Sequence, residues 1–345
     1  MNVLQVVLAV IVLGILILAH ELGHFIVAKR VGIKVEEFSI GFGPKIVSLR
    51  EGETLYSIRL LPIGGFVKMA GTNPDVDDMA DPRGFNKKSV PARMAVIGAG
   101  PFTNLIIASL LFAIMFGVLG IQRPSLKIME VLPGTPAALA GLKEGDEIKA
   151  LGGERLSDWE ELVERVSASK GKELTVVVRR NGLEKELEVT PEANPADPSR
   201  GFIGITPRFV TVKSGPVESL KQGIMYTFGV SFMFIKGLFA MLLGRIPADV
   251  AGPVGIAKIL GDAAKAGIRN LLYLVGLLSA NLGILNLLPF PALDGSRLVF
   301  LGIEGVRQRP VDPEKENLIH FIGFTLLMLL ALLVTYRDIL RISAS

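Results

Sequence analysis

The chain has 345 residues, half of them hydrophobic, and its mean hydropathy of +0.50 is too apolar for an ordinary soluble protein. It contains no cysteine, so disulfide bonds and thiolate metal ligands are both excluded. The net charge of +4 is small, and the basic residues gather in one loop, which favours a membrane protein and argues against nucleic-acid binding. Several long apolar runs predict an α-helical polytopic membrane protein with about four transmembrane helices.

The first predicted span covers residues 3–28 and ends with the pattern His20-Glu21-Leu22-Gly23-His24. Residues four apart share one face of a helix, so both imidazoles can bind one ion, with Glu21 beside them as the general base of a zinc site. The alternative is two core histidines, but ionisable groups at membrane depth usually mark function. At about 1.5 Å per residue, His20 lies roughly 26 Å from the start of the span, which predicts a zinc site near the cytoplasmic face.

Residues 29–93 form a basic loop, which the positive-inside rule assigns to the cytoplasm. Its eleven Lys and Arg residues are Lys29, Arg30, Lys34, Lys45, Arg50, Arg59, Lys68, Arg83, Lys87, Lys88 and Arg93. Runs 38–44, 55–60 and 62–69 predict short strands of a membrane-associated β-hairpin region. The hairpin is either a plain cytosolic one, or it dips toward the zinc and offers an edge near residues 55–69 to an extended substrate.

The second predicted span covers 94–120, with Pro101 and Asn104 near its start. Pro101 loosens the helix by leaving a carbonyl free. Asn104 is a polar group at membrane depth, and either a hydrogen bond between helices or a role in the active site accounts for it.

Residues 121–213 are soluble in character and predict an inserted α+β domain. Asn181-Gly182 joins two strands in a hairpin, and Asp158 caps an amphipathic helix over 158–168. The segment 136–148, with the sequence PAALAGLKEGDEI, resembles a PDZ domain of the bacterial protease-associated type. The segment 201–205 is either a loop that holds a peptide carboxylate through backbone N–H groups or a strand flanked by glycines.

The segment 222–243 is apolar enough to span, although Lys236 interrupts it. We expect it to lie along the outer surface as an interfacial helix, because a crossing there would put the end of the next span on the side opposite the zinc site.

The third span, 271–288, then runs inward over about 27 Å and brings Asp294 to the depth of His24. Catalytic zinc needs a third protein ligand and an open position, and Asp294 is the best candidate in a chain without cysteine. His320, the one remaining histidine, opens the fourth span (318–336) and is not expected to bind the metal.

Taken together, these motifs resemble the site-2 protease family, most closely the bacterial regulator-of-sigma-E-type intramembrane zinc metalloproteases with one PDZ domain. The resemblance covers essentially the whole chain. It implies that His20, His24 and Asp294 hold zinc and that Glu21 is the base. It also suggests substrate-binding roles, which would involve Asn286, Pro289, Gly41, Gly43 and Asn104. Ser296-Arg297 replaces the Gly-His that often follows the aspartate in the family, so the contacts after Asp294 differ.

The expected organisation has four parts: 1–120 with the first two spans and the β loop, 121–213 as the extracytoplasmic PDZ-like domain, 214–265 as interfacial amphipathic helices, and 266–345 with the last two spans. The expected partners are membrane lipid, peptide termini at the PDZ-like domain, and transmembrane substrates such as anti-sigma factors or signal-peptide remnants, in a bacterial cytoplasmic (inner) membrane. Two other functions stay open from the sequence, a non-catalytic PDZ adaptor and a metal transporter.

Overall fold

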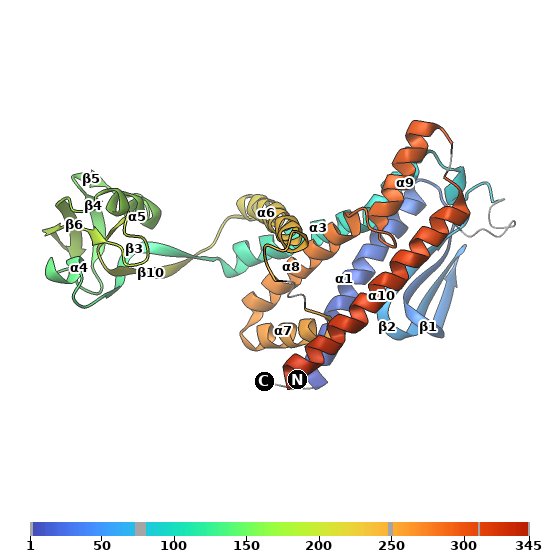
Figure 1. Ribbon diagram of the computed structural model, residues 1–345, viewed down its shortest axis with the longest axis horizontal. Helices are drawn as coiled ribbons and strands as arrows, with labels where there is room; N and C mark the ends of the chain where they lie inside the picture. The colour runs from blue at the N-terminus through green and yellow to red at the C-terminus, as the bar shows by residue number, and fades with distance from the viewer. Residues whose placement is uncertain (1–2, 73–80, 248–250, 310, 344–345) are drawn as a thin grey trace. The chain divides into compact units, whose positions relative to one another are not determined.

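The computed structural model describes residues 3–72, 81–247, 251–309 and 311–343 of the chain. They form two compact units, Met1–Gly117 with Gly215–Ser345, and Val118–Ser214. The first unit carries the long helices and the β-hairpin, and the second carries most of the strands with two short helices (Figure 1).

The first unit is built around one central helix, α3 (Val90–Ile114), which continues as a π-helical turn over Met115–Leu119. Helix α3 packs against α1 (Val3–Arg30), α6 (Pro216–Leu242), α8 (Ile268–Leu287) and α9 (Asp294–Arg307). Helix α7 (Pro253–Lys265) packs on α1, and α10 (Pro313–Ser343) contacts α7. This arrangement places α1 and α9, which are far apart in the sequence, on the same central helix.

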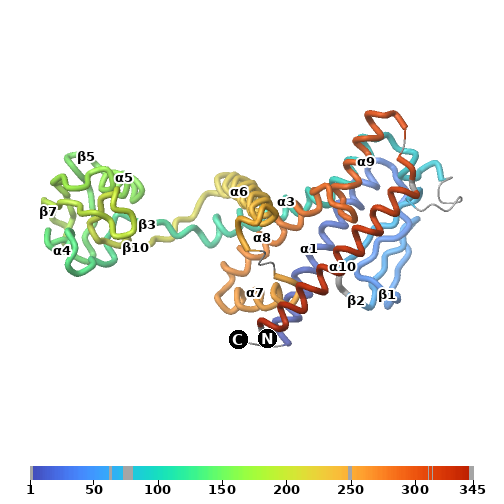
Figure 2. The backbone as a smooth tube through the Cα atoms, viewed as in Figure 1, coloured from blue at the N-terminus to red at the C-terminus, as the bar shows by residue number. Residues whose placement is uncertain are grey.

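Five of the described helices are long and apolar enough to cross a membrane: α1, α3, α6, α8 and α10. Four of them fall on the predicted spans. Helix α6 satisfies the same criterion over the region that we expected to lie on the membrane surface. Helix α6 packs along α3, where Gly223 lies against the backbone of α3 at Ser109 and Ala113, and it also contacts α8 (Figures 1 and 2).

The hairpin consists of β1 (Val35–Glu51) and β2 (Thr54–Met69), two long strands that fold back on themselves. Residues 37–40 of β1 pair with 55–58 on one side and with 65–68 on the other. Residues 55–58 pair in addition with 47–50. The stretch 55–58 therefore lies inside the sheet, and the expected edge near 55–69 is wrong for that part. Within the part of the chain that the structure describes, residues 65–67 of β2 pair with β1 on one side and with no strand on the other.

The second unit is a small α+β domain. Its strands are β3 (Ile121–Val131), β4 (Glu147–Leu151), β5 (Glu154–Arg155), β6 (Leu174–Arg180), β7 (Leu183–Val189), β8 (Glu192–Ala193), β9 (Gly201–Phe202) and β10 (Ile205–Val212), and its helices are α4 (Pro136–Leu139) and α5 (Trp159–Ala168). The main sheet has the order β10-β3-β4-β6-β7. Its core includes Ile128, Ile148, Leu162, Val176 and Val178.

Two local predictions explain how this domain is built. Asp158 caps α5 by accepting a hydrogen bond from the Glu161 backbone N–H at 2.9 Å. Asn181 and Gly182 both have positive φ, as a tight hairpin between β6 and β7 requires. The pKa of the buried Asp146 carboxyl is held below its usual value: burial opposes ionisation, but ion pairing with Arg180 and a hydrogen bond from the Lys143 N–H outweigh that cost.

Candidate metal centre and active site

Helix α1 supplies two of the candidate ligands from one face. His20 and His24 are both buried, and their Nε2 atoms lie 3.1 Å apart. Their spacing of four residues makes this pair a local consequence of the helix. They follow a long apolar stretch of α1, a helix that is long and apolar enough to cross a membrane.

The third candidate ligand comes from the other end of the chain. Asp294 is the first residue of α9, after the turn that follows α8. Its Oδ2 lies 3.0 Å from His20 Nε2 and 3.4 Å from His24 Nε2. Among the described residues, His20, His24 and Asp294 are the group of metal-ligating side chains that the structure brings together.

These three residues fit a zinc ion. Ligand atoms about 2.0–2.2 Å from a tetrahedral zinc lie roughly 3.3–3.6 Å from one another, within a few tenths of an ångström of the observed spacings. Asp294 Oδ2 is buried and makes no hydrogen bond to any described residue. A buried carboxylate oxygen without a hydrogen bond is costly unless a cation binds it. The donor set of two imidazoles and one carboxylate is also one that catalytic zinc uses.

Helix α3 leaves room for the centre by having no side chain at Gly100. A Cβ atom at that position would lie 2.7 Å from His20 Nε2 and closer still to His24 Nε2. Any larger residue would therefore fill the space toward which the nitrogen lone pairs point.

Hydrogen bonds at the far side of each ring fix its orientation. His24 Nδ1 lies 2.8 Å from the carbonyl oxygen of Val96, so Nδ1 carries the proton and donates it, which leaves Nε2 free to bind metal. His20 Nδ1 lies 3.5 Å from Asn104 Nδ2, and Asn104 Oδ1 is buried without a partner. Since two donors cannot bond to each other, zinc binding by His20 requires the Asn104 amide to be turned so that Oδ1 accepts from Nδ1–H.

Glu21 lies next to the ligands, and β2 passes directly over it. A Cβ atom on Gly65 would lie 3.2 Å from Glu21 Cγ and 2.8 Å from the carbonyl oxygen of Ser39. The part of β2 over residues 65–67, which pairs with β1 on one side and with no described strand on the other, therefore borders the candidate base.

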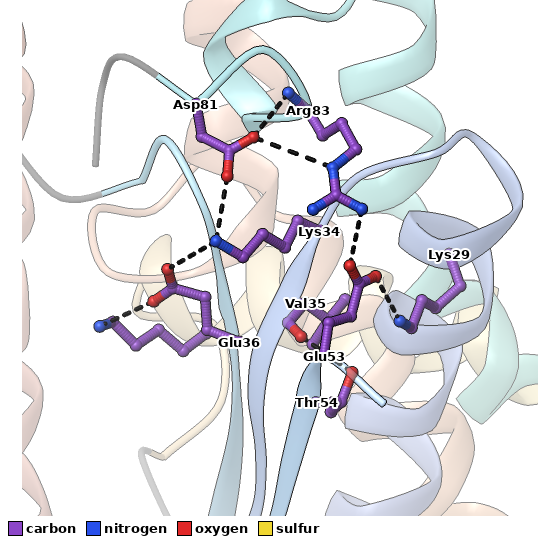
Figure 3. Close-up of polar contacts among 9 residues, drawn as sticks. Lys29, Lys34, Val35, Glu36, Glu53, Thr54, Asp81 and Arg83 are labelled. Atoms are coloured by element: carbon purple, nitrogen blue, oxygen red, sulfur yellow. Dashed lines mark hydrogen bonds and ion pairs between the residues drawn. The ribbon is translucent and has the colours of Figure 1, made fainter. Parts of the chain in front are cut away.

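An ion-pair network fastens the hairpin to the end of α1 (Figure 3). Glu53, at the hairpin turn, accepts from Lys29 at 2.8 Å and from Arg83 at 2.7 Å. Lys34 bonds to Asp81 at 3.0 Å and lies 4.0 Å from Glu36. The Lys29 ammonium, and then Arg83, hold the pKa of the Glu53 carboxyl below its usual value. Because the network is half-exposed, it contributes little to the free energy of unfolding. Its main effect is to fix the position of β2.

The remaining predicted residues are more scattered. Asn286 is half-buried in the last turn of α8, and Pro289 is exposed just after it. Gly41 and Gly43 have positive φ where β1 bends; a Cβ on Gly41 would collide with the Leu61 carbonyl, and Gly43 O accepts from Arg59. These two glycines shape the hairpin.

Sequence reasoning did not assign site roles to Gly65, Gly100 or Val96. Glycine at 100 was visible in the motif before Pro101, but no periodicity tells which glycine faces a ligand. Val96 acts through its backbone carbonyl, which every residue has, so the identity of the side chain does not indicate this role. Helix α9 and the start of α10 at Pro313 were not predicted either, so His320 lies within α10 and not at the boundary of the helix.

Comparison with known proteins identifies the family of this chain. The sequence profile of Peptidase family M50 matches residues 8–330. Zinc metalloprotease RasP of Geobacillus kaustophilus is 36% identical, and the match covers 96% of this chain and 96% of that protein. The regulator of sigma-W protease RasP of Bacillus subtilis is 33% identical, with 99% of this chain and 100% of that protein covered. These similarities favour a metalloprotease over the adaptor and the transporter.

Among solved structures, the PDZ domain of an SdrC-like protein from Listeria innocua matches 24% of this chain and 93% of its own, at 20% identity and a TM-score of 0.23.

Proposed function

The chain belongs to peptidase family M50, the site-2 protease family, and is a zinc metalloprotease; on that basis we propose that His20, His24 and Asp294 hold its zinc and that Glu21 is its general base. The observation that carries the proposal is the convergence of two imidazole nitrogens and one unbonded carboxylate oxygen within 3.4 Å. Asn104 supports His20 from the far side of its ring.

The reaction is hydrolysis of a peptide bond within a transmembrane segment of a single-span protein. Zinc in this site supplies the Lewis acidity that activates water and polarises the scissile carbonyl. Glu21 accepts the proton of the attacking water and returns it to the leaving amine. The two imidazoles are buried and the Asp294 side chain is 18% exposed, which limits the access of bulk water to the site.

A matched substitution tests the role of Glu21. Glu21→Gln keeps the size of the side chain and leaves the proposed ligands in place, so zinc content is expected to stay unchanged while cleavage is lost. The assay is co-expression of each form with single-span substrates, followed by detection of cleavage products. A purified Glu21→Gln enzyme with full activity would remove Glu21 from the base role.

We propose that the substrate adds to the open edge of β2. A helical substrate hides its carbonyls in its own hydrogen bonds, so it must unwind before attack. Unwound backbone within a membrane needs replacement hydrogen bonds. The part of β2 around residues 64–67 offers them on the side that pairs with no described strand, and Gly65 lies beside Glu21. Asn286 and Pro289, at the end of α8, are proposed to hold the unwound segment.

The second unit is proposed to be a PDZ-like domain that selects substrates by a peptide terminus. Its support is the sequence of 136–148 and the short connection at Ile203 and Gly204 between β9 and β10, whose backbone N–H groups are proposed to hold a terminal carboxylate. The substrates proposed are anti-sigma factors or signal-peptide remnants; the Bacillus subtilis relative is named for the regulation of sigma-W.

We propose that the protein lies in a bacterial cytoplasmic membrane with the PDZ-like domain outside and the zinc site near the cytoplasmic face. Helix α6 is proposed to lie along the outer surface, and Lys236 within it supports this placement. Because the chain has no cysteine, single cysteines introduced at Ser199 and Lys236 can be labelled with a membrane-impermeant reagent in intact cells. Labelling of both is expected; protection of position 199 would reverse the orientation.

A further inference from the structure

The turn that delivers Asp294 to the zinc site has an unusual backbone conformation. Ala292 has φ +77°, in the left-handed region that residues with a side chain rarely adopt. Asp294 follows two residues later as the first residue of α9, and Leu293 at the helix N-cap makes no side-chain cap bond. The direction of the Asp294 carboxylate therefore depends on how this turn is held.

Helix α10 holds the turn through a single histidine. The backbone N–H of Ala292 donates to His320 Nδ1 at 3.1 Å. The His320 side chain is only 16% exposed, and its ring packs edge-on against Phe300 of α9. One turn further along α10, a Cβ on Gly323 would lie 2.6 Å from the carbonyl oxygen of Pro291, so the backbone of α10 sits directly against the turn.

The tautomer of His320 follows from this bond. Nδ1 accepts, so the proton lies on Nε2, and Glu316 Oε1 is 3.7 Å from that nitrogen. The C-terminal half of α9 is fixed independently, because Arg93 of α3 forms a bidentate ion pair with Glu304. Helix α9 is thus anchored to α3 at its C-terminal half and to α10 at the turn before its first residue.

We propose that His320 is a positioning residue for the zinc site: its Nδ1 holds the Ala292 N–H, keeps the turn in its left-handed conformation and so fixes Asp294 opposite His20 and His24. His320 touches neither the ligands nor the substrate edge in this role. The inference rests on the proposed ligand set, since it gives His320 a function only if Asp294 binds the metal.

Three substitutions at one position separate hydrogen bonding from packing. Asparagine places its Oδ1 at the same distance along the side chain as Nδ1, and leucine has the same shape as asparagine without an acceptor. Glutamine places its acceptor at the level of Nε2 and loses the one at Nδ1. We therefore expect His320→Asn to bind zinc within about threefold of the unchanged protein, whereas His320→Leu and His320→Gln lose zinc about 10–100-fold more readily, as partners behind a metal ligand do.

The experiment uses the full-length protein in detergent, loaded with zinc and challenged with increasing chelator. Hydrogen exchange of the peptide covering 288–296 is measured in parallel in the metal-free protein, where faster exchange in His320→Leu than in His320→Asn is expected. Thr335→Val, which removes a hydroxyl elsewhere on α10, serves as the control for damage to that helix and is expected to match the unchanged protein.

Zinc retention in His320→Leu equal to that of the unchanged protein would overturn the proposal. Equal losses of zinc in His320→Leu and His320→Asn would also overturn it, because the imidazole ring would then matter and not the hydrogen-bond acceptor at Nδ1. Asp294→Asn is measured beside them. If Asp294→Asn keeps zinc as tightly as the unchanged protein, the proposed ligand set fails; if it loses zinc while His320→Leu does not, only the inference about His320 fails.

Discussion

The absence of a side chain at Gly100 leaves room for the metal centre, and the substitution Gly100→Ala, which adds one methyl group there, tests this directly. A Cβ at this position would lie 2.7 Å from both His20 Nε2 and His24 Cε1. Non-bonded atoms need about 3.5 Å, so the two rings or α3 must move by roughly 0.8 Å. Zinc sites tolerate about 0.2 Å in their ligand distances, and misplacement of reacting groups by about 1 Å costs on the order of 100-fold in rate.

Gly100→Ala is therefore expected to lower zinc affinity by at least about tenfold and cleavage by on the order of 100-fold. Gly98→Ala is the matched control: it lies on the same helix, and its added Cβ meets the Phe102 ring at an ordinary 3.6 Å. Both changes raise helix propensity equally, so general stability does not distinguish them. The assay is zinc retention against a chelator together with cleavage of a single-span substrate. Zinc retention by Gly100→Ala equal to that of Gly98→Ala would refute the assignment of this space to the metal.

Three further predictions concern the surroundings of the site and the second unit. Asn104→Leu is expected to weaken zinc binding by about 10–100-fold, because His20 Nδ1–H loses its hydrogen-bond acceptor. Asn104→Asp and the neighbouring control Thr103→Val are expected to retain zinc. Chelator titration measures zinc binding in all three, and tight binding by Asn104→Leu would contradict the role of Asn104 as the acceptor. Gly65→Val is expected to abolish cleavage while zinc content stays unchanged, since its added Cβ meets Glu21 and the Ser39 carbonyl of β1; loss of zinc would show instead that the hairpin supports the metal. Asp146 has a lowered pKa, so the stability it contributes is complete above its unfolded value of about 3.9 and is lost as the pH falls below that value. Thermal unfolding followed by fluorescence of Trp159, the one tryptophan of the chain, is expected to show this acid-dependent loss in the unchanged protein and a flatter pH profile in Asp146→Asn, and parallel profiles would refute it.

The sequence by itself determined what local rules control. His20 and His24 share a face because they are four apart on an apolar helix, Asp158 caps α5, and Asn181-Gly182 closes a hairpin. Each of these depends only on residues within one or two turns. The family of the chain followed from the same short motifs, and the comparisons confirmed it.

Tertiary structure alone decided which distant groups meet at the site. The sequence predicted that Asp294 reaches the depth of His24, but only the packed helices bring its carboxylate within 3.0 Å of His20 Nε2. Nothing in the sequence shows that Gly100 faces the two imidazoles or that Val96 offers its carbonyl to His24. The fold-back of β1 and β2 moved 55–58 into the sheet and left the end of β2 as the edge beside Glu21. His320, which the sequence places at a helix boundary, supports the turn before Asp294. Local periodicity fixes the direction of a side chain within its own helix or strand, but the packing of whole elements sets what that side chain meets.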